Sequence, residues 1–402
     1  MKENKTKPDI RFKGFTEAWE QRKLNEIVGI YDGVHQTPKY QDSGIMFLSV
    51  ENISTLQSTK YISEEDFKRD YKVYPQENDI LMTRIGDVGT TNVVTDNSLK
   101  AYYVSLALLK YKNTNPYFLS NAMQSDYVQK GLANRTLKTA VPMKINKDEI
   151  GKVDIILSAS VEEQSKIGSY FKNIDNLITL HQRECDQLKE LKKSMLKKMF
   201  PRDESSIPEV RFAGFTDAWE QRKFVRVFDG LQNNTLSRAD LNYEGGTVKN
   251  VHYGDVLIKF GDYINASKTE LPYISDSTKA DKFKSSFLQD GDIIIADTAE
   301  DDTVGKCTEI QGSEGLKLLS GLHTIACRPK EKYGQMFLGY YINSPAYHNQ
   351  LKPLMQGIKV TSISKSALQG TDTIMPKSID EQIRIGEYFS TLDNLITLHQ
   401  RL

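Results

Sequence analysis

The sequence predicts a mixed α and β protein: two globular domains in a pseudo-two-fold arrangement, separated by two long helices that form an antiparallel coiled coil. Two observations predict the duplication, because one segment recurs 200 residues later and a second segment recurs 218 residues later. A third observation, an apolar seam at alternating steps of three and four residues, predicts the helices. Such a pattern is typical of an internal repeat whose halves are related by a two-fold axis.

The repeated opening segments are PDIRFKGFTEAWEQRKL (8–24) and PEVRFAGFTDAWEQRKF (208–224), identical at 12 of 17 positions. Trp19 and Trp219, the only two tryptophans, occupy the same place, so we expect each indole to fill an equivalent apolar pocket. The repeated closing segments are EEQSKIGSYFKNIDNLITLHQR (162–183) and DEQIRIGEYFSTLDNLITLHQR (380–401). Each half therefore has a near-constant beginning and end around a divergent middle.

We divide the chain into four parts on this basis. Residues 1–155 and 208–375 are the two globular domains, residues 156–207 are a central helix that acts as a spacer, and residues 376–402 are a distal helix. In the divergent middles, stretches rich in β-forming residues and bounded by turn residues predict strands at 44–50, 78–87, 254–264, 291–297 and 321–329. Amphipathic stretches at 115–132 and 334–351 predict helices.

The central helix is predicted over 162–199, and Pro201 ends it. Its 38 residues would span about 57 Å at 1.5 Å per residue. We expect its partner to be its own repeat at 380–401, running antiparallel. The second copy stops at Arg401-Leu402, so residues 185–199 have no repeated counterpart. We therefore expect weaker binding of a partner protein at the distal helix. The side chains predicted to pack in the seam or against a partner protein are Ile167, Phe171, Ile174, Ile178, Leu188, Ile396 and Leu398.

Composition is that of an ordinary globular chain long enough for two or three domains. Three cysteines, Cys185, Cys307 and Cys327, are too few and too scattered for a disulfide framework, so a reducing compartment is expected. No apolar run has the length of a signal peptide core or a membrane span, which predicts a cytoplasmic protein without a membrane partner.

The formal net charge is zero, from 53 basic and 53 acidic residues, but the charges are segregated. Residues 97–147 contain a single acid, Asp126, and residues 315–371 contain a single acid, Glu331, whereas both stretches are rich in lysine and arginine. One such stretch is ordinarily a solvated face. Because the same asymmetry occurs at the same place in both halves, we interpret it as a surface that faces a polyanion.

No catalytic constellation is found. The chain lacks a phosphate-binding loop of the G-x-x-x-x-G-K-[ST] type, and Asn115-Pro116-Tyr117 resembles an amino-methyltransferase motif only in part, so a helix start at Pro116 is the better interpretation. The six histidines are scattered, and His181 and His399 are interpreted as packing residues at equivalent seam positions. We therefore predict that this chain carries no catalytic residue, no metal site and no cofactor of its own.

The signature P-x-[IV]-R-F-x-G-F-x-x-x-W before each divergent middle, with E-Q-x-x-I-G-x-[YF] after it, resembles the specificity subunit of type I restriction-modification systems. The resemblance covers nearly the whole chain. It implies a non-catalytic subunit in which each globule is a target recognition domain that reads one half of a split, asymmetric site in double-stranded DNA. It also implies two methyltransferase partners and two ATP-driven translocase-nuclease partners, with S-adenosylmethionine, ATP and Mg on those partners.

Within this hypothesis, basic side chains of the acid-poor stretches would hold phosphates, and polar or bidentate groups on loops would read bases. The predicted DNA-binding residues are Arg84, Asn92, Lys130, Asn134, Arg135, Lys138 and Lys144 in the first globule, and Lys352, Lys359, Thr361, Ser362 and Lys365 in the second. Two alternatives remain open. One is a pseudo-symmetric scaffold that binds helical protein partners without DNA, and the other is a nuclease or methyltransferase with an unrecognised site.

Overall fold

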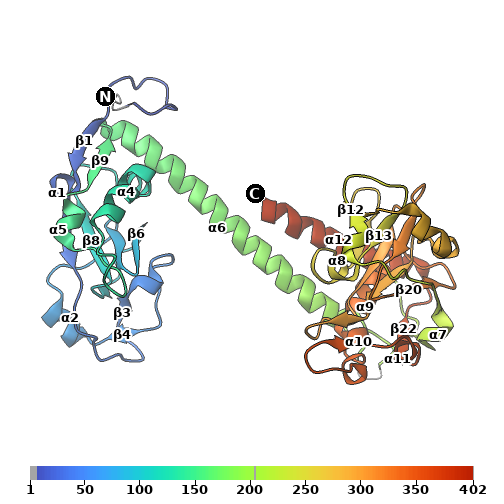
Figure 1. The fold of residues 1–402 in the computed structure, drawn as a ribbon. Coiled ribbons are helices and arrows are strands. Elements are labelled where there is room, and N and C mark those ends of the chain that lie inside the picture. Colours follow the sequence, from blue (N-terminus) through green and yellow to red (C-terminus); the bar gives the residue numbers. More distant parts are fainter. Residues whose placement is uncertain (1–6, 203–204, 402) are drawn as a thin grey trace. The chain divides into compact units, whose positions relative to one another are not determined.

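The computed structural model describes residues 7–202 and 205–401, and the chain divides into two compact units, unit 1 (Met1–Thr179) and unit 2 (Leu180–Leu402). Each unit is mixed α and β, and each contributes to a long helix, as predicted (Figure 1). The pseudo-two-fold relation between the units and the four-part division of the chain stay predictions.

The helices and strands up to the end of the central helix are β1 (Glu20–Lys23), α1 (Leu24–Ile27), β2 (Val28–Asp32), β3 (Ile45–Leu48), β4 (Tyr61–Ile62), α2 (Glu64–Asp70), β5 (Ile80–Ile85), β6 (Asp87–Val93), β7 (Lys100–Tyr102), β8 (Leu106–Tyr111), α3 (Pro116–Met123), α4 (Asp126–Arg135), α5 (Lys147–Gly151), β9 (Asp154–Leu157) and α6 (Val161–Lys198). A short 3-10 helix covers Val50–Asn52.

The elements that follow are β10 (Glu220–Lys223), α7 (Phe224–Val227), β11 (Phe228–Gly230), β12 (Leu241–Asn242), β13 (Lys249–Val251), α8 (Tyr253–Ile258), β14 (Tyr263–Asn265), β15 (Tyr273–Ile274), β16 (Ile293–Ala296), β17 (Thr298–Ala299), β18 (Cys307–Gln311), β19 (Leu318–Ser320), β20 (Thr324–Pro329), α9 (Phe337–Asn343), α10 (Pro345–His348), β21 (Thr361–Ser362), α11 (Lys365–Gln369), β22 (Asp372–Met375) and α12 (Ile379–Arg401). Three 3-10 helices cover Arg238–Asp240, Ser277–Ser286 and Lys352–Leu354.

A sheet buried on both faces forms the centre of each unit. In unit 1 it has the antiparallel order β2-β8-β5-β6, and in unit 2 the order is β11-β20-β16-β18-β14. Side chains alternate between the two faces, so Ile80 packs in one core cluster of unit 1 and Leu81 in another. Ile293 and Ile294 divide in the same way in unit 2. Burial of both faces explains why these strands read as unbroken apolar runs.

The entry to the central strand is built identically in the two units. Asp79 accepts the backbone N–H of Gln76 before β5, and Asp292 accepts the backbone N–H of Gln289 before β16, at 2.8 and 2.9 Å. The residue in front of each aspartate has a positive φ, +71° at Asn78 and +88° at Gly291. Asparagine and glycine tolerate this left-handed conformation better than other residues. The recurring sequences ENDIL and DGDII therefore encode one turn.

The two repeated segments of each half contact one another through a buried ion pair. In unit 1, Arg11 Nε and Nη2 donate to the two carboxylate oxygens of Glu163 at 2.5 and 2.8 Å, and Trp19 Nε1 donates at 3.2 Å. Burial opposes ionisation of Glu163, but the hydrogen bonds and charge of Arg11 outweigh it and hold the pKa of Glu163 below its ordinary value. We call this trio the unit 1 clamp.

Unit 2 repeats the trio as the unit 2 clamp. Arg211 donates to both carboxylate oxygens of Glu381 at 2.7 and 2.9 Å, and Trp219 Nε1 donates at 3.3 Å. The Glu381 side chain is only 1% exposed. Bidentate arginine–carboxylate pairs combine charge with fixed geometry. The arginine and tryptophan of the opening segment and the glutamate of the closing segment are therefore repeated together because they form one structural unit.

Other residues of the repeated opening and closing segments also contact one another in both units. The rings of Phe12 and Tyr170 meet edge to face, as do those of Phe212 and Tyr388. Strands β1 and β9 pair antiparallel, and β10 pairs with β22 in the same register. In α12, a Cβ at Gly386 would lie 2.3 Å from the Gln335 carbonyl oxygen, so the helix approaches its neighbour as closely as only glycine permits.

The long helix α6 spans 38 residues, and α12 lies antiparallel along its C-terminal half within unit 2 (Figure 1). His181 contacts His399, and further along α6 Lys192 Nζ donates to Asp393 of α12 at 2.7 and 2.9 Å. Leu188 packs against the apolar core that contains parts of α12. Antiparallel pairing of α12 with α6 is therefore present, but its contacts lie in the C-terminal half of α6. They include residues 185–199, which were expected to have no counterpart.

Three element predictions were wrong. Residues 254–264 were expected to form a strand, but they contain α8, whose start is capped by His252 accepting the N–H of Gly254. A short apolar run does not distinguish a buried strand from a helix, and the helical pattern appears only in burial, with Val256 buried and Ile258 90% exposed. The helix predicted at 115–132 is divided into α3 and α4, because Ser125 caps a new helix; Pro116 does begin α3. The helix predicted at 334–351 is likewise divided into α9 and α10, which are separated at Ser344.

Candidate nucleic-acid interface

Many basic residues of the acid-poor stretches are neutralised by acids from elsewhere in the chain. Lys110 on β8 pairs with Asp79 at 2.5 Å, and Arg328 on β20 pairs with Asp292 at 2.7 Å. Each of the two aspartates before the central strands therefore forms an ion pair with one basic side chain. Further pairs join Lys100 to Asp96, Arg135 to Glu149 and Lys330 to Asp229. Segregation of charge in the sequence is therefore partly removed by tertiary pairing.

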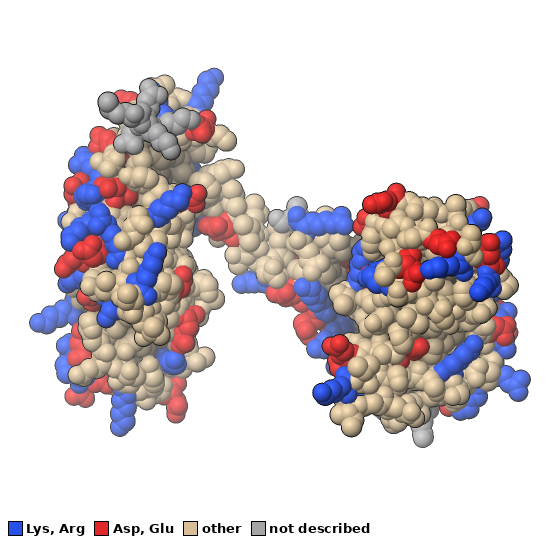
Figure 2. All heavy atoms as spheres, in the orientation of Figure 1, with Lys and Arg blue, Asp and Glu red and all other residues tan. Residues whose placement is uncertain are grey.

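The lysines that remain unpaired include most of those predicted to hold phosphates. Within residues 7–202 and 205–401, no ion pair is made by the following exposed lysines: Lys130, Lys138, Lys144, Lys352, Lys359 and Lys365. An exposed ammonium group with no partner acid keeps its full charge for a ligand. Figure 2 shows Lys and Arg interspersed with Asp and Glu on the visible face of each unit, so positive charge is available locally.

In unit 1, two of these lysines lie on an exposed loop, residues 136–144, which we call the unit 1 loop. Its ends pair through Leu137 N–H to the Lys144 carbonyl at 2.8 Å, and Gly86 N–H, at the β5–β6 turn, donates to Met143 at 2.8 Å. Val141 in the loop is 97% exposed. The loop is therefore anchored on the central sheet at its base and presents Lys138, Lys144 and an apolar residue to solvent.

In unit 2, residues 355–362 form a corresponding loop, the unit 2 loop, between α10 and α11. Gln356 and Ser362 exchange two backbone hydrogen bonds of 2.9 and 2.8 Å, and β21 pairs with β17 beside the central sheet. At the tight turn, Gly357 has φ +118°, and a Cβ there would lie 1.9 Å from the Val360 carbonyl oxygen. The tip carries the exposed Lys359 next to the fully exposed Ile358.

The two loops occupy the same place in their units but differ in sequence. Each follows the second of a helix pair and precedes the short helix that leads into the last strand of the unit. One reads TLKTAVPMK and the other MQGIKVTS. Lysine side chains can bind phosphate or guanine, and apolar side chains can contact the methyl group of thymine. Each loop therefore presents groups of the kind that contact nucleic acids, and the two sets of groups differ.

Arg84, predicted to read a base, is placed differently. Its side chain is 7% exposed, and the guanidinium pairs with Asp32 and donates to the Ile145 carbonyl oxygen at 3.2 Å. Burial lowers the pKa of Arg84 from its ordinary value. The group is already satisfied inside unit 1, so we remove it from the base-reading set. Sequence alone did not reveal this, because Asp32 lies 52 residues away on β2.

The other predicted DNA-binding residues lie on several elements, and their roles stay predictions. Asn92 is held by Ile53 and Ser54, whose carbonyl oxygens accept its amide at 2.9 and 3.1 Å. Asn134, Arg135 and Lys130 line one cavity beside α4. Thr361 and Ser362 form β21 in the unit 2 loop, and Lys352 and Lys365 lie just before and just after that loop.

Sequence reasoning missed Val141 and Ile358, the apolar residues most exposed on the two loops. The available signal was a β-branched residue within three positions of a lysine, in a segment with neither helical nor strand periodicity, at the same place in both halves. A large apolar side chain fully exposed on an anchored loop is a candidate contact for a ligand.

The predicted seam residues divide into three groups. Ile167 packs against the core of unit 1, while Leu188 packs against the core of unit 2 and Ile396 is buried. Phe171, Ile178 and Leu398 are 41%, 57% and 53% exposed, and Ile174 is half-buried. Their role in binding a partner stays a prediction. Among the residues that the structure describes, no helix is both long and apolar enough to cross a membrane.

Comparisons with known proteins agree with these features. Residues 16–190 match the family described as "Type I restriction modification DNA specificity domain". The chain is 24% identical over 285 residues to the type I restriction enzyme MjaVIII specificity subunit of Methanocaldococcus jannaschii, and the alignment covers 67% of this chain but only 62% of that protein. It is 23% identical over 412 residues to a second protein of that organism, named for the specificity subunit of the MjaX type I restriction enzyme, covering 96% of this chain and 89% of that one.

The fold has a solved counterpart as well. The crystal structure of the type I restriction-modification S subunit from M. genitalium has a TM-score of 0.60 to this chain, with 12% sequence identity, and the match covers 98% of this chain and 94% of that one. At this identity the likeness concerns the fold. The matched domain and the two relatives, together with the repeated segments, show that this chain is similar to type I restriction-modification specificity subunits.

Proposed function

We propose that this chain is the DNA-recognition subunit of a type I restriction-modification complex, and that each unit reads one half of a bipartite, asymmetric DNA site. The observation that carries the proposal is the pair of anchored loops, 136–144 and 355–362, each with unpaired lysine and an exposed apolar tip. Because the loops occupy equivalent places but differ in sequence, the two half-sites should differ.

Partner subunits would supply the chemistry. We propose that methyltransferase subunits, with S-adenosylmethionine, and translocase-nuclease subunits, with ATP and Mg, assemble on this chain, which itself catalyses nothing. The exposed apolar side chains of Phe171 and Ile178 on α6 support a docking surface for the methyltransferase. Isolated exposed apolar residues are common, but two on one helix face, about two turns apart, suit a helical partner.

Methylation mapping tests the proposal directly. The gene would be expressed with its cognate methyltransferase gene in a methylation-free host, and adenine methylation would be mapped by long-read sequencing. We expect a split motif with a constant gap that is absent when this gene is omitted. Absence of any motif, although the two proteins co-purify, would refute DNA recognition and favour the scaffold hypothesis.

The loops are tested by variants in the same assay. Ile358→Ala combined with Lys359→Ala should relax only one half of the motif, and Val141→Ala combined with Lys138→Ala should relax only the other half. Binding measured at several salt concentrations adds a second reading, because loss of one phosphate contact should lower the salt slope by about one unit. Lys68→Ala, an exposed lysine of α2, is the matched control. If Lys138→Ala behaves like Lys68→Ala, the unit 1 loop does not contact DNA.

A further inference from the structure

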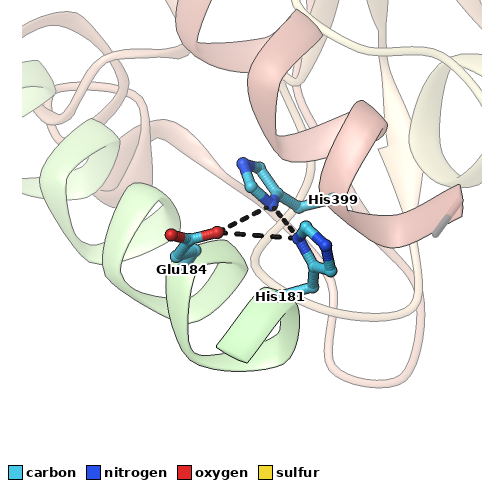
Figure 3. A group of neighbouring side chains, drawn as sticks. All are labelled: His181, Glu184 and His399. Carbon is cyan, nitrogen blue, oxygen red and sulfur yellow. Dashed lines mark hydrogen bonds and ion pairs between the residues drawn. The ribbon is translucent and has the colours of Figure 1, made fainter. Parts of the chain in front are cut away.

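Three polar side chains, which were not predicted to form a cluster, contact one another where α12 lies against α6. His181 and Glu184 project from consecutive turns of α6, and His399 projects toward them from the last turn of α12 (Figure 3). The two Nδ1 atoms are 3.0 Å apart, and a Glu184 carboxylate oxygen lies 3.6 Å from His181 Nδ1 and 3.3 Å from His399 Nδ1. Interpreting the histidines as packing residues alone therefore misses this polar cluster.

The three atoms form a triangle with the dimensions of a metal coordination face. Zinc binds histidine nitrogen and carboxylate oxygen at about 2.0–2.2 Å, so neighbouring ligand atoms in a tetrahedral site lie about 3.3–3.5 Å apart. The edges of this triangle are 3.0, 3.3 and 3.6 Å. All three atoms are Lewis bases when both imidazoles carry their proton on Nε2. In this arrangement three lone pairs point toward one another and repel. A bound cation would remove this repulsion.

The surroundings suit an ion that enters from solvent. The side chains of His181, Glu184 and His399 are 28%, 41% and 18% exposed, so the cluster is partly open. Two histidines and one glutamate, with a fourth position left for water, are an established zinc ligand set. In the part of the chain that the structure describes, no other group of three histidine, cysteine or acidic side chains has this geometry.

We propose that His181 Nδ1, His399 Nδ1 and the Glu184 carboxylate bind one divalent transition-metal ion of the zinc class, which cross-links the end of α12 to α6. The two histidines come from the same position of the repeated sequence TLHQR, whereas the glutamate occurs in the first copy only. Two of the ligands, the histidines, would thus come from equivalent positions of the repeat, and the third, the glutamate, would come from one copy alone. Its role is structural, since it fastens the last described turn of α12 to α6.

Metal binding would be measured on the full-length chain without an affinity tag, after removal of metals by EDTA. Zinc content after equilibration with ZnSO4 and dialysis should be one ion per chain, and CoCl2 should give the intense visible bands of tetrahedral cobalt. Zinc binding should weaken in each of the variants His181→Ala, Glu184→Gln and His399→Ala. The loss of affinity should exceed about 10–100-fold, which is the usual effect of removing a hydrogen-bond partner of a metal ligand. His35→Ala, a change at an exposed histidine elsewhere, is the matched control and should bind like the parent chain.

A second measurement distinguishes this site from loss of folding. Hydrogen exchange of the backbone amides in residues 395–401 should slow on addition of zinc to the parent chain and should not respond in His399→Ala, while the core strands exchange equally in both proteins. The proposal is overturned if the parent chain binds no stoichiometric zinc, or if bound zinc is unaffected by His399→Ala. DNA is absent from both assays, so their outcome is independent of the proposed function.

Discussion

The unit 2 clamp should contribute about 3 kcal/mol to folding, and Glu381→Gln tests this value. The glutamate side chain is 1% exposed and receives two hydrogen bonds from Arg211 and one from Trp219. Glutamine keeps the shape but offers one acceptor oxygen, so an amide N–H₂ group would face an arginine donor. Breaking a buried ion pair by removing one partner costs about 3–5 kcal/mol, and we take the lower end because Arg211 is 12% exposed.

Urea unfolding followed by tryptophan fluorescence measures the loss. The background change Trp19→Phe leaves Trp219, a member of the unit 2 clamp, as the single tryptophan, so the signal reports on unit 2. The midpoint should fall with an unchanged m-value. For a unit of this size, a loss of about 3 kcal/mol corresponds to a decrease in Tm of about 6–12 °C.

Asp380→Asn is the matched control, because it removes the same charge by the same isosteric change from an exposed neighbour in the first turn of α12. It should cost no more than about 1 kcal/mol, the usual contribution of a charge at a helix N-terminus. If Glu381→Gln costs no more than Asp380→Asn, the repeated arginine and tryptophan do not act through this glutamate, and our explanation of the repeated segments is wrong.

Three further predictions concern packing, pH and assembly. Gly386→Ala should destabilise unit 2 by about 1–3 kcal/mol in the same urea assay, although alanine favours a helix by about 1 kcal/mol, because its Cβ would lie 2.3 Å from the Gln335 carbonyl oxygen; a gain in stability would contradict the close approach. Burial raises the pKa of Glu309 from 4.5 to about 7, so the folded state binds this proton more tightly and stability should fall by about 3 kcal/mol as pH rises from 4.5 through 7. Other groups titrate alike in the parent and in Glu309→Gln, so the difference between their stability–pH curves isolates Glu309, and parallel curves would refute its role. Ile178→Glu should leave the isolated chain folded, since Ile178 is 57% exposed, but should abolish co-purification with the methyltransferase, whereas Asn176→Glu, at an exposed polar neighbour, should not.

Much of the fold could be predicted because its signals are local or repeated. The 38-residue helix α6 was predicted to within one residue at each end, since its apolar period and Pro201 are readable within the segment itself. Strands β3, β5, β16 and β20 were predicted for the same reason. The failure at 254–264 was local as well, because a run of only a few apolar residues carries no reliable period.

Predicted site residues divide by whether their partners lie nearby in the sequence. Lys138 and Lys359 were predicted as DNA-binding residues from local composition, and both lie on exposed loops. Arg84 could not be assigned correctly, because the aspartate that occupies its guanidinium lies on another strand. The charge segregation that suggested a basic surface was overestimated for the same reason, since Asp79 and Asp292 reach across the sheet to neutralise Lys110 and Arg328.

By itself, the sequence determined the duplication, the long helix, the mixed α and β class and the resemblance to a known family, because repeated residues and helical periods can be recognised without any knowledge of contacts. Only the tertiary structure decided which charges remain free, why the repeated arginine, tryptophan and glutamate belong together, and that His181, Glu184 and His399 meet. The physical reason is distance along the chain: Arg211 and Glu381 are 170 residues apart, and His181 and His399 are 218 apart. Hydrogen bonds and ion pairs act over a few ångströms in space, so folding must first bring such residues together.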